Sequence, residues 1–252
     1  MSEPDPHDAG LTRIVAVRHG ETVWNAETRM QGQLDTALSA HGRWQTRRAA
    51  AALAHESFDA VFASDLARAF DTAAAIVAGR SLEIATDPGL RERSFGIFQG
   101  STYAEIDARW SDEAARWRRH DPDFGPEGGE TLRDFDARAI AAVTAIARSQ
   151  AGRSILIVSH GGVLDCLYRA ASRIDLGASR SWQLGNAAIN RLLWTPQGFT
   201  LVGWSDTSHL DGATLDDGSE GDAATALASG GVARGPPRPT ASMSMTSTRP
   251  RL

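Results

Sequence analysis

The chain has 252 residues, of which 42% are hydrophobic, and a formal net charge of −5. This is enough for one large α/β domain or two small ones, and the charge provides no general basic field for nucleic acid or an anionic membrane. All 26 basic residues are arginine, which excludes a P-loop lysine, a Schiff-base lysine and a pyridoxal phosphate enzyme. A binding site for an anion must therefore depend on a few side chains gathered in one place and not on the overall charge.

The single cysteine, Cys166, stands in an apolar pattern and excludes both an internal disulfide and a cysteine zinc cluster. We interpret it as a buried structural thiol. Residues 1–10 contain no hydrophobic run, and no apolar stretch approaches the ~20 residues of a membrane span. We expect a soluble, cytoplasmic protein without a membrane or nucleic-acid partner, and the oligomeric state stays open.

The order of the predicted elements indicates the fold class. Strands alternate with helices as far as about residue 172, which is typical of an α/β fold with three layers, a mostly parallel sheet and helices on both faces. A closing hairpin would add an antiparallel edge. Short apolar runs predict strands at residues 14–17, 60–63, 82–84, 155–158, 189–194 and 199–204. Amphipathic patterns predict helices at residues 40–55, 66–78, 131–148 and 163–172, and a helical region at 101–120.

Local signals at the ends of these elements refine the organisation. Ser39 is a candidate N-cap for the first long helix, and Ser64 with Asp65 is a candidate cap for the second. We expect a flexible start at residues 1–10 and one folded domain at residues 11–210. Residues 211–252 are rich in Gly, Ser, Ala, Thr and Pro, which predicts a disordered tail.

Two of the predicted strands end in the same chemistry. Residues 14–17 lead into Arg18 and His19, and residues 155–158 lead into Ser159 and His160, each followed by glycine. Because the carboxyl ends of parallel strands meet at one edge of a sheet, both imidazoles are expected there. A third strand end is followed by Arg68, and a glycine-flanked loop carries Glu92.

These residue types fit the transfer of a phosphoryl group. Arg18 and Arg68 offer permanently charged, planar donors to a phosphate monoester. They also lower the pKa of a neighbouring His19, which leaves a neutral ring nitrogen to attack phosphorus. Glu92 is a candidate to protonate the leaving alkoxide and then to deprotonate water; the arginines lower its pKa and a bound phosphate dianion would raise it. Glu21 is an alternative proton donor.

In these motifs the chain resembles the histidine phosphatase superfamily, which includes the cofactor-dependent phosphoglycerate mutases. The likeness covers about residues 13–204. It runs, in order, through Arg18-His19-Gly20-Glu21-Thr22, Trp24-Asn25, Met30-Gln31-Gly32, Leu38-Ser39, Ser64-Asp65-Leu66, Leu90-Arg91-Glu92, Gly128-Gly129-Glu130-Thr131 and Ser159-His160-Gly161-Gly162.

The resemblance implies a role for each matched residue. His19 would be phosphorylated and Glu92 would be the acid and base, with no metal and no cofactor implied. The implied phosphate pocket consists of Arg18, Arg68 and His160, with further contacts from Asn25 and Gln31 and backbone groups from Gly32 and Gly161.

Departures from the mutases favour the compact phosphatase branch. Ser94-Phe95 stands where the mutases have a His-Tyr pair, and the stretch from Arg119 to the second histidine is much shorter than theirs. We therefore expect a metal-independent phosphomonoester hydrolase that acts through phosphohistidine on a small phosphorylated metabolite. A phosphoglycerate mutase is the alternative, and a catalytically silent phospholigand-binding module a third. Specificity is expected to come from residues 94–129.

Overall fold

The structure, a computed structural model, describes residues 10–211 of the chain. The flexible start predicted for residues 1–10 and the tail predicted for residues 211–252 lie outside the described residues, except for Gly10 and Asp211. The strands are β1 (Thr12–Arg18), β2 (Ala60–Ala63), β3 (Ile84–Thr86), β4 (Ser154–Ser159), β5 (Ile189–Thr195) and β6 (Gly198–Asp206). The helices are α1 (Val23–Ala26), α2 (Ala40–Ala52), α3 (Ala67–Ile76), α4 (Tyr103–Arg109), α5 (Ser111–Arg118), α6 (Leu132–Ser149) and α7 (Gly161–Ser172).

The six strands form one sheet in the order β3-β2-β4-β1-β5-β6. The pairs β2–β3, β2–β4 and β1–β4 are parallel, whereas β5 pairs antiparallel with β1 and β6 antiparallel with β5. The mostly parallel sheet and its antiparallel edge are thus confirmed. The arrangement makes β1 and β4 direct neighbours at the centre of the sheet, with Arg18 paired to Ser159.

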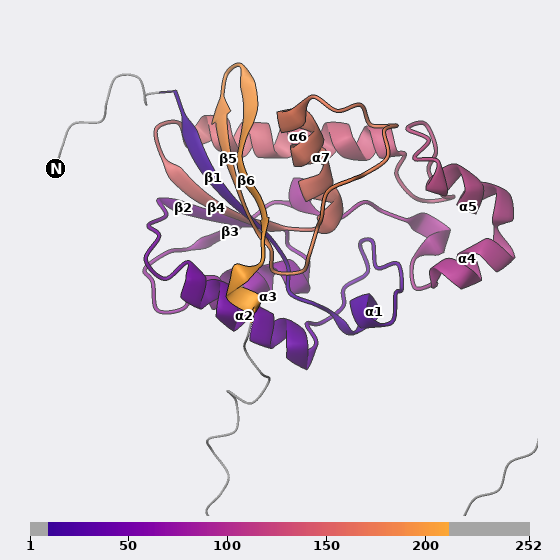
Figure 1. Cartoon of the computed structure of the whole chain (residues 1–252), viewed down its shortest axis with the longest axis horizontal. Coiled ribbons are helices and arrows are strands. Elements are labelled where there is room, and N and C mark those ends of the chain that lie inside the picture. The colour runs from indigo at the N-terminus through magenta and orange to yellow at the C-terminus, as the bar shows by residue number, and fades with distance from the viewer. Residues whose placement is uncertain (1–9, 212–252) are drawn as a thin grey trace, which may run out of the picture. The chain divides into compact units, whose positions relative to one another are not determined.

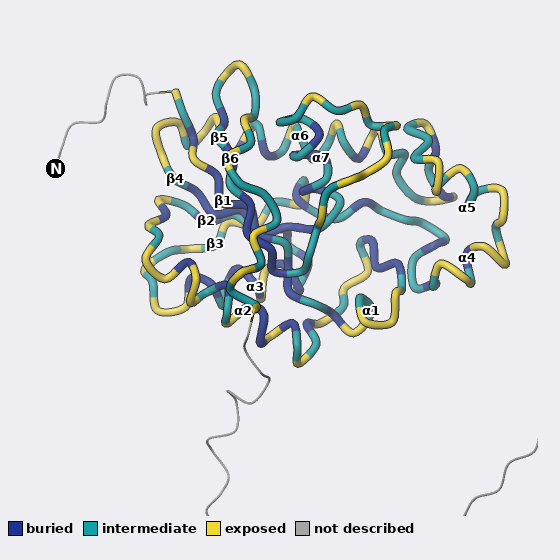
Figure 2. The backbone as a smooth tube through the Cα atoms, viewed as in Figure 1, coloured by how far each residue is buried: buried dark blue, intermediate teal, exposed yellow. Residues whose placement is uncertain are grey.

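The central strands bury side chains on both faces, which explains why they read as continuous apolar runs. Ile14 and Ala16 pack into a cluster with α6 and α7, whereas Val15 and Val17 pack into a second cluster with α2 and α3. Figure 1 shows the two helix pairs on opposite faces of the sheet, and Figure 2 shows the buried backbone concentrated between them. The predicted three-layer α/β class is confirmed.

Several predicted boundaries shift for reasons outside the local sequence. The helix predicted to reach residue 55 ends at Ala52, and Arg80 donates to the carbonyls of Leu53 (2.5 Å) and Glu56 (2.7 Å) just beyond it. The strand predicted at residues 82–84 lies at Ile84–Thr86, where it pairs in register with β2. In both places a contact with a distant segment decides where the element ends.

The predicted cap of α3 is wrong. The N-cap residue is Leu66, which makes no side-chain cap, and the Asp35 carboxylate accepts from the Ala67 amide at 2.8 Å instead. Asp65 is occupied by a bidentate ion pair with Arg91, at 2.7 and 2.6 Å. Ser64 Oγ accepts from the Leu66 amide at 3.3 Å, one residue before the helix begins. The first amide of the helix itself is therefore capped from 32 residues upstream and not by Ser64 or Asp65.

The helical region predicted at residues 101–120 is divided into α4 and α5 at Trp110, whose backbone leaves the helical range (φ −139°, ψ 60°). Ile106, Trp110 and Trp117 from this region pack with Phe98 in a separate small hydrophobic cluster. In Figure 1 this α4–α5 segment lies apart from the sheet and its helices. It therefore supplies a second wall from which a cavity can be built.

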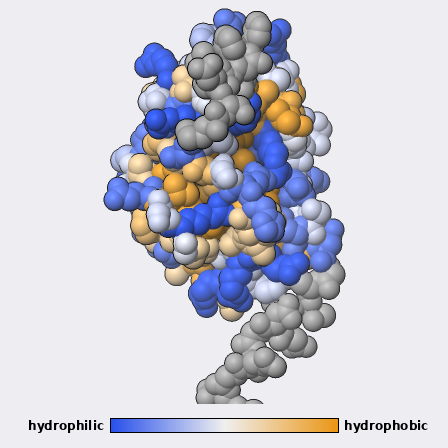
Figure 3. Space-filling view, turned by 90° about the vertical axis from the view of Figure 1, so that its left-hand side faces the viewer, coloured by the Kyte–Doolittle hydropathy of each residue, from blue (hydrophilic) through white to orange (hydrophobic). Residues whose placement is uncertain are grey.

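One face of the molecule is of mixed polarity. In the space-filling view of Figure 3, hydrophilic residues are spread over the face with hydrophobic residues between them. Among residues 10–211, no helix has the length and apolar character that crossing a membrane requires.

Candidate active site

The paired ends of β1 and β4 place two histidines side by side. His19 and His160 follow Arg18 and Ser159, which are partners in the parallel register. Both side chains are almost fully buried, at 3% and 0% exposure, and their ring centroids lie 5.1 Å apart with the planes inclined by 60°. The juxtaposition that the sequence predicted for the two imidazoles is confirmed.

The hydrogen bonds of His19 select one of its ring nitrogens for chemistry. Nδ1 lies 2.7 Å from the Gly20 carbonyl oxygen, and because that oxygen only accepts, Nδ1 carries the proton and Nε2 keeps a lone pair. Burial lowers the pKa of His19 well below its usual value, and the charges of Arg68 and Arg18 lower it further. The ring is therefore neutral at pH 7.

Two arginines are fixed beside this ring by backbone carbonyls. Arg68 of α3 is 1% exposed and donates to the Leu34 carbonyl at 2.9 Å and to the Gly32 carbonyl at 2.7 Å. Burial lowers its pKa to about 10, so it stays charged at neutral pH. Arg18 donates through Nη1 to the Leu184 carbonyl. Anchored in this way, both guanidinium groups hold a fixed orientation.

Four buried polar atoms at this point have no hydrogen-bond partner within the described part of the chain. They are Nε of Arg18, Nε of Arg68 and both ring nitrogens of His160. The pKa of His160 is lowered by burial first and by Arg68 next. A neutral His160 ring has one N–H donor and one acceptor nitrogen, so three of these four atoms are donors. Because buried polar groups are ordinarily satisfied, three unpartnered donors fit an oxygen-rich anion.

Glu92 faces the same place from the loop after the 3-10 helix Pro88–Leu90. Its carboxylate accepts from its neighbouring amide, Arg93 N, at 2.8 Å and from the Gly162 amide at the start of α7 at 3.1 Å. Its charge acts on both Arg18 and Arg68. The Glu92 carboxylate thus interacts electrostatically with both arginines.

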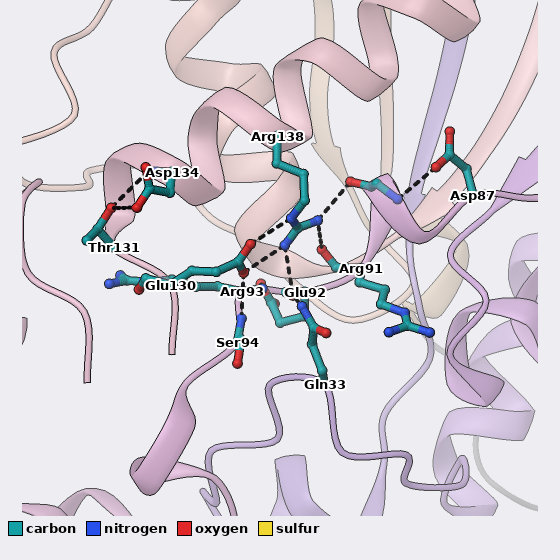
Figure 4. Close-up of polar contacts among 11 residues, drawn as sticks. Gln33, Asp87, Arg91, Glu92, Arg93, Ser94, Glu130, Thr131, Asp134 and Arg138 are labelled. Carbon is teal, nitrogen blue, oxygen red and sulfur yellow. Dashed lines mark hydrogen bonds and ion pairs between the residues drawn. The ribbon is translucent and has the colours of Figure 1, made fainter. Parts of the chain in front are cut away.

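An ion pair behind Glu92 fixes the loop that carries it, and we call Arg138 with Glu130 the Arg138 clasp (Figure 4). Arg138 of α6 donates to both carboxylate oxygens of Glu130, at 2.7 and 2.8 Å, and to the carbonyls of Gly89 (2.9 Å), Arg91 (3.1 Å) and Glu92 (3.3 Å). Glu130 in turn accepts from the Ser94 amide at 2.8 Å. The loop is therefore held on both sides of Glu92.

The other predicted binding residues line the same cavity from the segment after β1. Asn25 closes a capping box with Thr22 at the start of α1. Gln31 is buried and its side-chain oxygen accepts from the Thr36 hydroxyl. Gly32 has a φ of +55°, a conformation suited to glycine, and its carbonyl holds Arg68.

Every residue of the predicted site except His160 lines one cavity of about 480 Å³. His160 is fully buried, with its ring beside that of His19. The cavity also includes residues that the sequence did not single out, chiefly from two places. One is the α4–α5 wall with Tyr103, Trp117, His120 and Phe124, which lies within the region expected to set specificity; the other is residues 180–185, which no sequence signal indicated. Arg29, Arg93, Asp121 and Asp165 are further charged residues that line the cavity.

Two further expectations can be compared with the structure. The Glu21 carboxylate accepts from the Ser39 hydroxyl at 2.8 Å, so this alternative proton donor is engaged with the cap of α2. Cys166 is buried at 1% exposure, and burial raises the pKa of its thiol well above the usual value. The interpretation of Cys166 as a buried structural thiol agrees with this placement.

The fold and site define an α/β enzyme whose central sheet presents a cationic, histidine-containing cup at the carboxyl ends of its strands. The family model of the histidine phosphatase superfamily (branch 1) matches residues 14–207. The chain belongs to this superfamily. Across residues 10–211, no group of three or more His, Cys, Asp or Glu side chains is arranged to hold a metal ion.

Curated relatives include both mutases and phosphatases by name. The chain is 39% identical over 212 residues to phosphoglycerate mutase-like protein 4 of Arabidopsis thaliana, covering 82% of this chain and 90% of that protein. It is 35% identical over 226 residues to the metal-independent phosphoserine phosphatase of the same plant, covering 88% of this chain and 93% of that protein.

Solved structures agree with this assignment. YhfR of Bacillus stearothermophilus matches with a TM-score of 0.75 and 31% identity, over 79% of this chain and all of that one (100%). A mycobacterial glucosyl-3-phosphoglycerate phosphatase, in complex with VO3, matches with a TM-score of 0.69 and 34% identity, over 77% of this chain and 99% of that one.

Proposed function

We propose that the chain is a metal-independent phosphomonoester hydrolase that works through phosphorylated His19 on a small phosphorylated metabolite. We assign this activity to residues 11–210. The observation that supports it most is a neutral imidazole whose Nε2 is free, buried beside two anchored guanidinium groups. Such a site binds a phosphate dianion and offers it a nucleophile at the same time.

In the proposed complex, the phosphoryl oxygens are bound by Arg18, Arg68 and His160. These three residues supply the unpartnered buried nitrogens described above. Asn25, Gln31 and the backbone amides of Gly32 and Gly161 would complete the pocket. The amides at the start of α7 add the positive end of the helix dipole, which favours an anion.

The proposed reaction has two displacements. In the first, Nε2 of His19 forms a bond to phosphorus, the bond from phosphorus to the ester oxygen breaks, and Glu92 gives a proton to the leaving alkoxide. In the second, Glu92 takes a proton from water, the oxygen of that water bonds to phosphorus, and the bond from phosphorus to Nε2 breaks. Glu92 thus ends each cycle protonated as it began, and a general acid of this kind contributes typically about 10²- to 10⁴-fold in rate.

Hydrolysis is favoured over mutase activity by two features of this chain. Ser94-Phe95 follows Glu92-Arg93, and the segment between the cavity wall at Trp117 and His160 is short for a mutase. A mutase must keep water from its phosphohistidine while the substrate reorients, whereas a phosphatase must admit water. The mutase remains the second candidate, because relatives of both names match the chain.

The first test is turnover of p-nitrophenyl phosphate in the presence of a chelator. We expect the wild-type chain to release nitrophenol, and His19→Ala to release none and to accept no ³²P from labelled substrate, since the nucleophile is gone. His55→Ala is the matched control, because His55 is an exposed histidine just beyond the C-terminal end of α2. Nitrophenol release by His19→Ala at the wild-type rate would contradict the proposal.

A second assay separates the two reactions. With 3-phosphoglycerate as the substrate, we expect inorganic phosphate to form faster than 2-phosphoglycerate. Faster isomerisation than phosphate release would identify a mutase, and phosphate binding without turnover of any phosphoester would identify a silent binding module.

A further inference from the structure

Helix α7 carries a second polar group into the cavity, one turn beyond its phosphate-facing start. Gly161, Gly162 and Asp165 all line the cavity. Residues four apart lie on one face of a helix, so Asp165 stands about 6 Å further along the axis than Gly161. A phosphate held at the start of α7 would therefore have its alcohol portion within reach of Asp165.

The Asp165 carboxylate is held in place through one of its two oxygens, and the other oxygen lacks a hydrogen-bond partner among the described residues. Its Oδ2 accepts from Nε of Arg169 at 2.8 Å. Arg169 is 2% exposed and is itself anchored through Nη1 on the Asp175 carbonyl at 2.6 Å. The other oxygen, Oδ1, is buried and has no hydrogen-bond partner among the described residues. A buried carboxylate oxygen of this kind is stabilised by a donor, and the cavity is where a ligand can bring one.

An indole next to Asp165 offers the complementary group. Trp182 lines the cavity and stacks on Tyr168 with centroids 4.2 Å apart and planes inclined by 22°. The Arg169 guanidinium lies 4.9 Å from the centre of the same indole ring. The indole Nε1 is buried and unpartnered in the part of the chain that the structure describes. Arg169 therefore orders an acceptor, Asp165, and a donor, Trp182, on one wall.

We propose that Asp165 and Trp182 form a subsite for the alcohol portion of the ester, and that the substrates are phosphate esters whose alcohol carries a hydrogen-bond donor, a hydroxyl or an ammonium group. The assignment of the bound group as the alcohol portion of a phosphate ester rests on the proposed function, whereas the hydrogen-bonding site at Asp165 and Trp182 does not. Asp165 Oδ1 accepts from the donor, and the indole Nε1 donates to any neighbouring oxygen of the ligand. This makes Asp165 a specificity-determining residue rather than a part of the phosphate pocket.

The test compares three esters by calorimetric binding to the His19→Ala variant, which does not depend on turnover. Propyl phosphate carries no donor, glycerol 1-phosphate carries hydroxyls on the same skeleton, and 2-aminoethyl phosphate carries an ammonium group. We expect at least one donor-bearing ester to bind about tenfold more tightly than propyl phosphate, the size of one hydrogen bond to a charged acceptor. The ester that binds more tightly than propyl phosphate identifies the preferred donor, a hydroxyl or an ammonium group. Equal affinities for all three esters would overturn the proposal.

The sharpest variant is Asp165→Asn in the same His19→Ala background. Arg169 must still meet an oxygen, so the amide oxygen takes the place of Oδ2 and the NH₂ group faces the cavity, which converts the acceptor into a donor. We expect the preference for donor-bearing esters to fall to near onefold, while the affinity for inorganic phosphate stays within about twofold. Asp71→Asn, at an exposed position on α3, is the control and should keep the preference.

The result also separates the two proposals. A preference that survives Asp165→Asn overturns the subsite even if His19-dependent hydrolysis is observed. A donor preference that Asp165→Asn removes supports the subsite even if no ester is hydrolysed. Should Asp165→Asn fail to fold, Trp182→Phe keeps an aromatic ring and removes the Nε1 donor. The affinity for glycerol 1-phosphate relative to 2-aminoethyl phosphate should then fall, because only glycerol 1-phosphate has hydroxyl oxygens to accept from the indole, and an unchanged ratio would count against the subsite.

Discussion

Gly162 shows how closely one residue of the site is specified. A methyl group added at this position would lie 2.1 Å from Glu92 Oε1 and 2.9 Å from the Phe135 ring. Alanine at a compatible helical position usually stabilises a protein by about 0.4–1 kcal/mol, but here it meets the carboxylate. Glycine at this position is therefore what lets Glu92 approach the amide at the start of α7.

We predict that Gly162→Ala displaces Glu92 and lowers kcat/KM for an alkyl phosphate about a hundredfold, the lower end of what a general acid contributes. Steady-state kinetics on glycerol 1-phosphate measure this. Gly203→Ala is the control, because its added methyl would meet no atom closer than 4.0 Å. Wild-type kinetics in Gly162→Ala would show that Glu92 does not need its present position.

At the scale of elements, the Arg138 clasp joins α6 to the loop that carries Glu92 (Figure 4). We predict that Arg138→Met lowers kcat/KM for an alkyl phosphate about tenfold but lowers that for p-nitrophenyl phosphate less than threefold. A mobile Glu92 would protonate the leaving group poorly. An alkoxide needs that proton in order to leave, whereas p-nitrophenolate leaves without one. Parallel assays of the two substrates measure the difference.

The same helix provides a matched control for this experiment. Arg133 forms a bidentate ion pair with Asp123 at 2.7 and 3.2 Å, and both side chains are more than half exposed. Exposed pairs of this kind contribute little, so Arg133→Met should leave both rates unchanged. An equal loss on both substrates in Arg138→Met would indicate general destabilisation and would contradict a positioning role.

The elements that the sequence predicts well are those whose signals are local. The apolar runs before His19 and His160 define two buried strands, and the parallel topology then brings the two imidazoles together. The start of α3 is different, because its amide is capped by Asp35 from 32 residues upstream. No window around residue 66 contains that information, so the nearest Ser and Asp were the best local choice.

At the scale of the whole molecule, the cavity joins segments whose sequence separation exceeds 150 residues. The phosphate end could be predicted, because its residues follow strand ends or stand in recognisable motifs. The wall at residues 180–185 could not, since this stretch has no periodicity and its role depends on the Arg18 contact with the Leu184 carbonyl and on the stacking of Trp182. The role of such a loop depends on long-range contacts, which the local sequence does not contain.

The folded molecule also carries a cost at acid pH, because it buries two neutral imidazoles. Burial and neighbouring arginines lower the pKa of His19 and of His160 well below 6.5, whereas the unfolded chain takes up protons near that pH. Below pH 6.5 the unfolded state thus binds more protons, so stability is complete above pH 6.5 and decreases as the pH falls. The limit is about 1.4 kcal/mol per pH unit for each ring.

We predict that the free energy of unfolding decreases by about 2 kcal/mol between pH 6.5 and pH 5.5, about 1 kcal/mol for each ring, because an unfolded imidazole is only half protonated at pH 6.5. Urea denaturation at a series of pH values measures it, and the decrease in His160→Gln should be about 1 kcal/mol smaller, because the contribution of one buried ring is removed. The acidic groups with lowered pKa, such as Asp65 and Glu130, lose their protons below their usual values, so their contribution belongs to a more acidic range. A slope that is flat in the wild type, or equally steep in His160→Gln, would mean that the two rings are not held neutral by the fold.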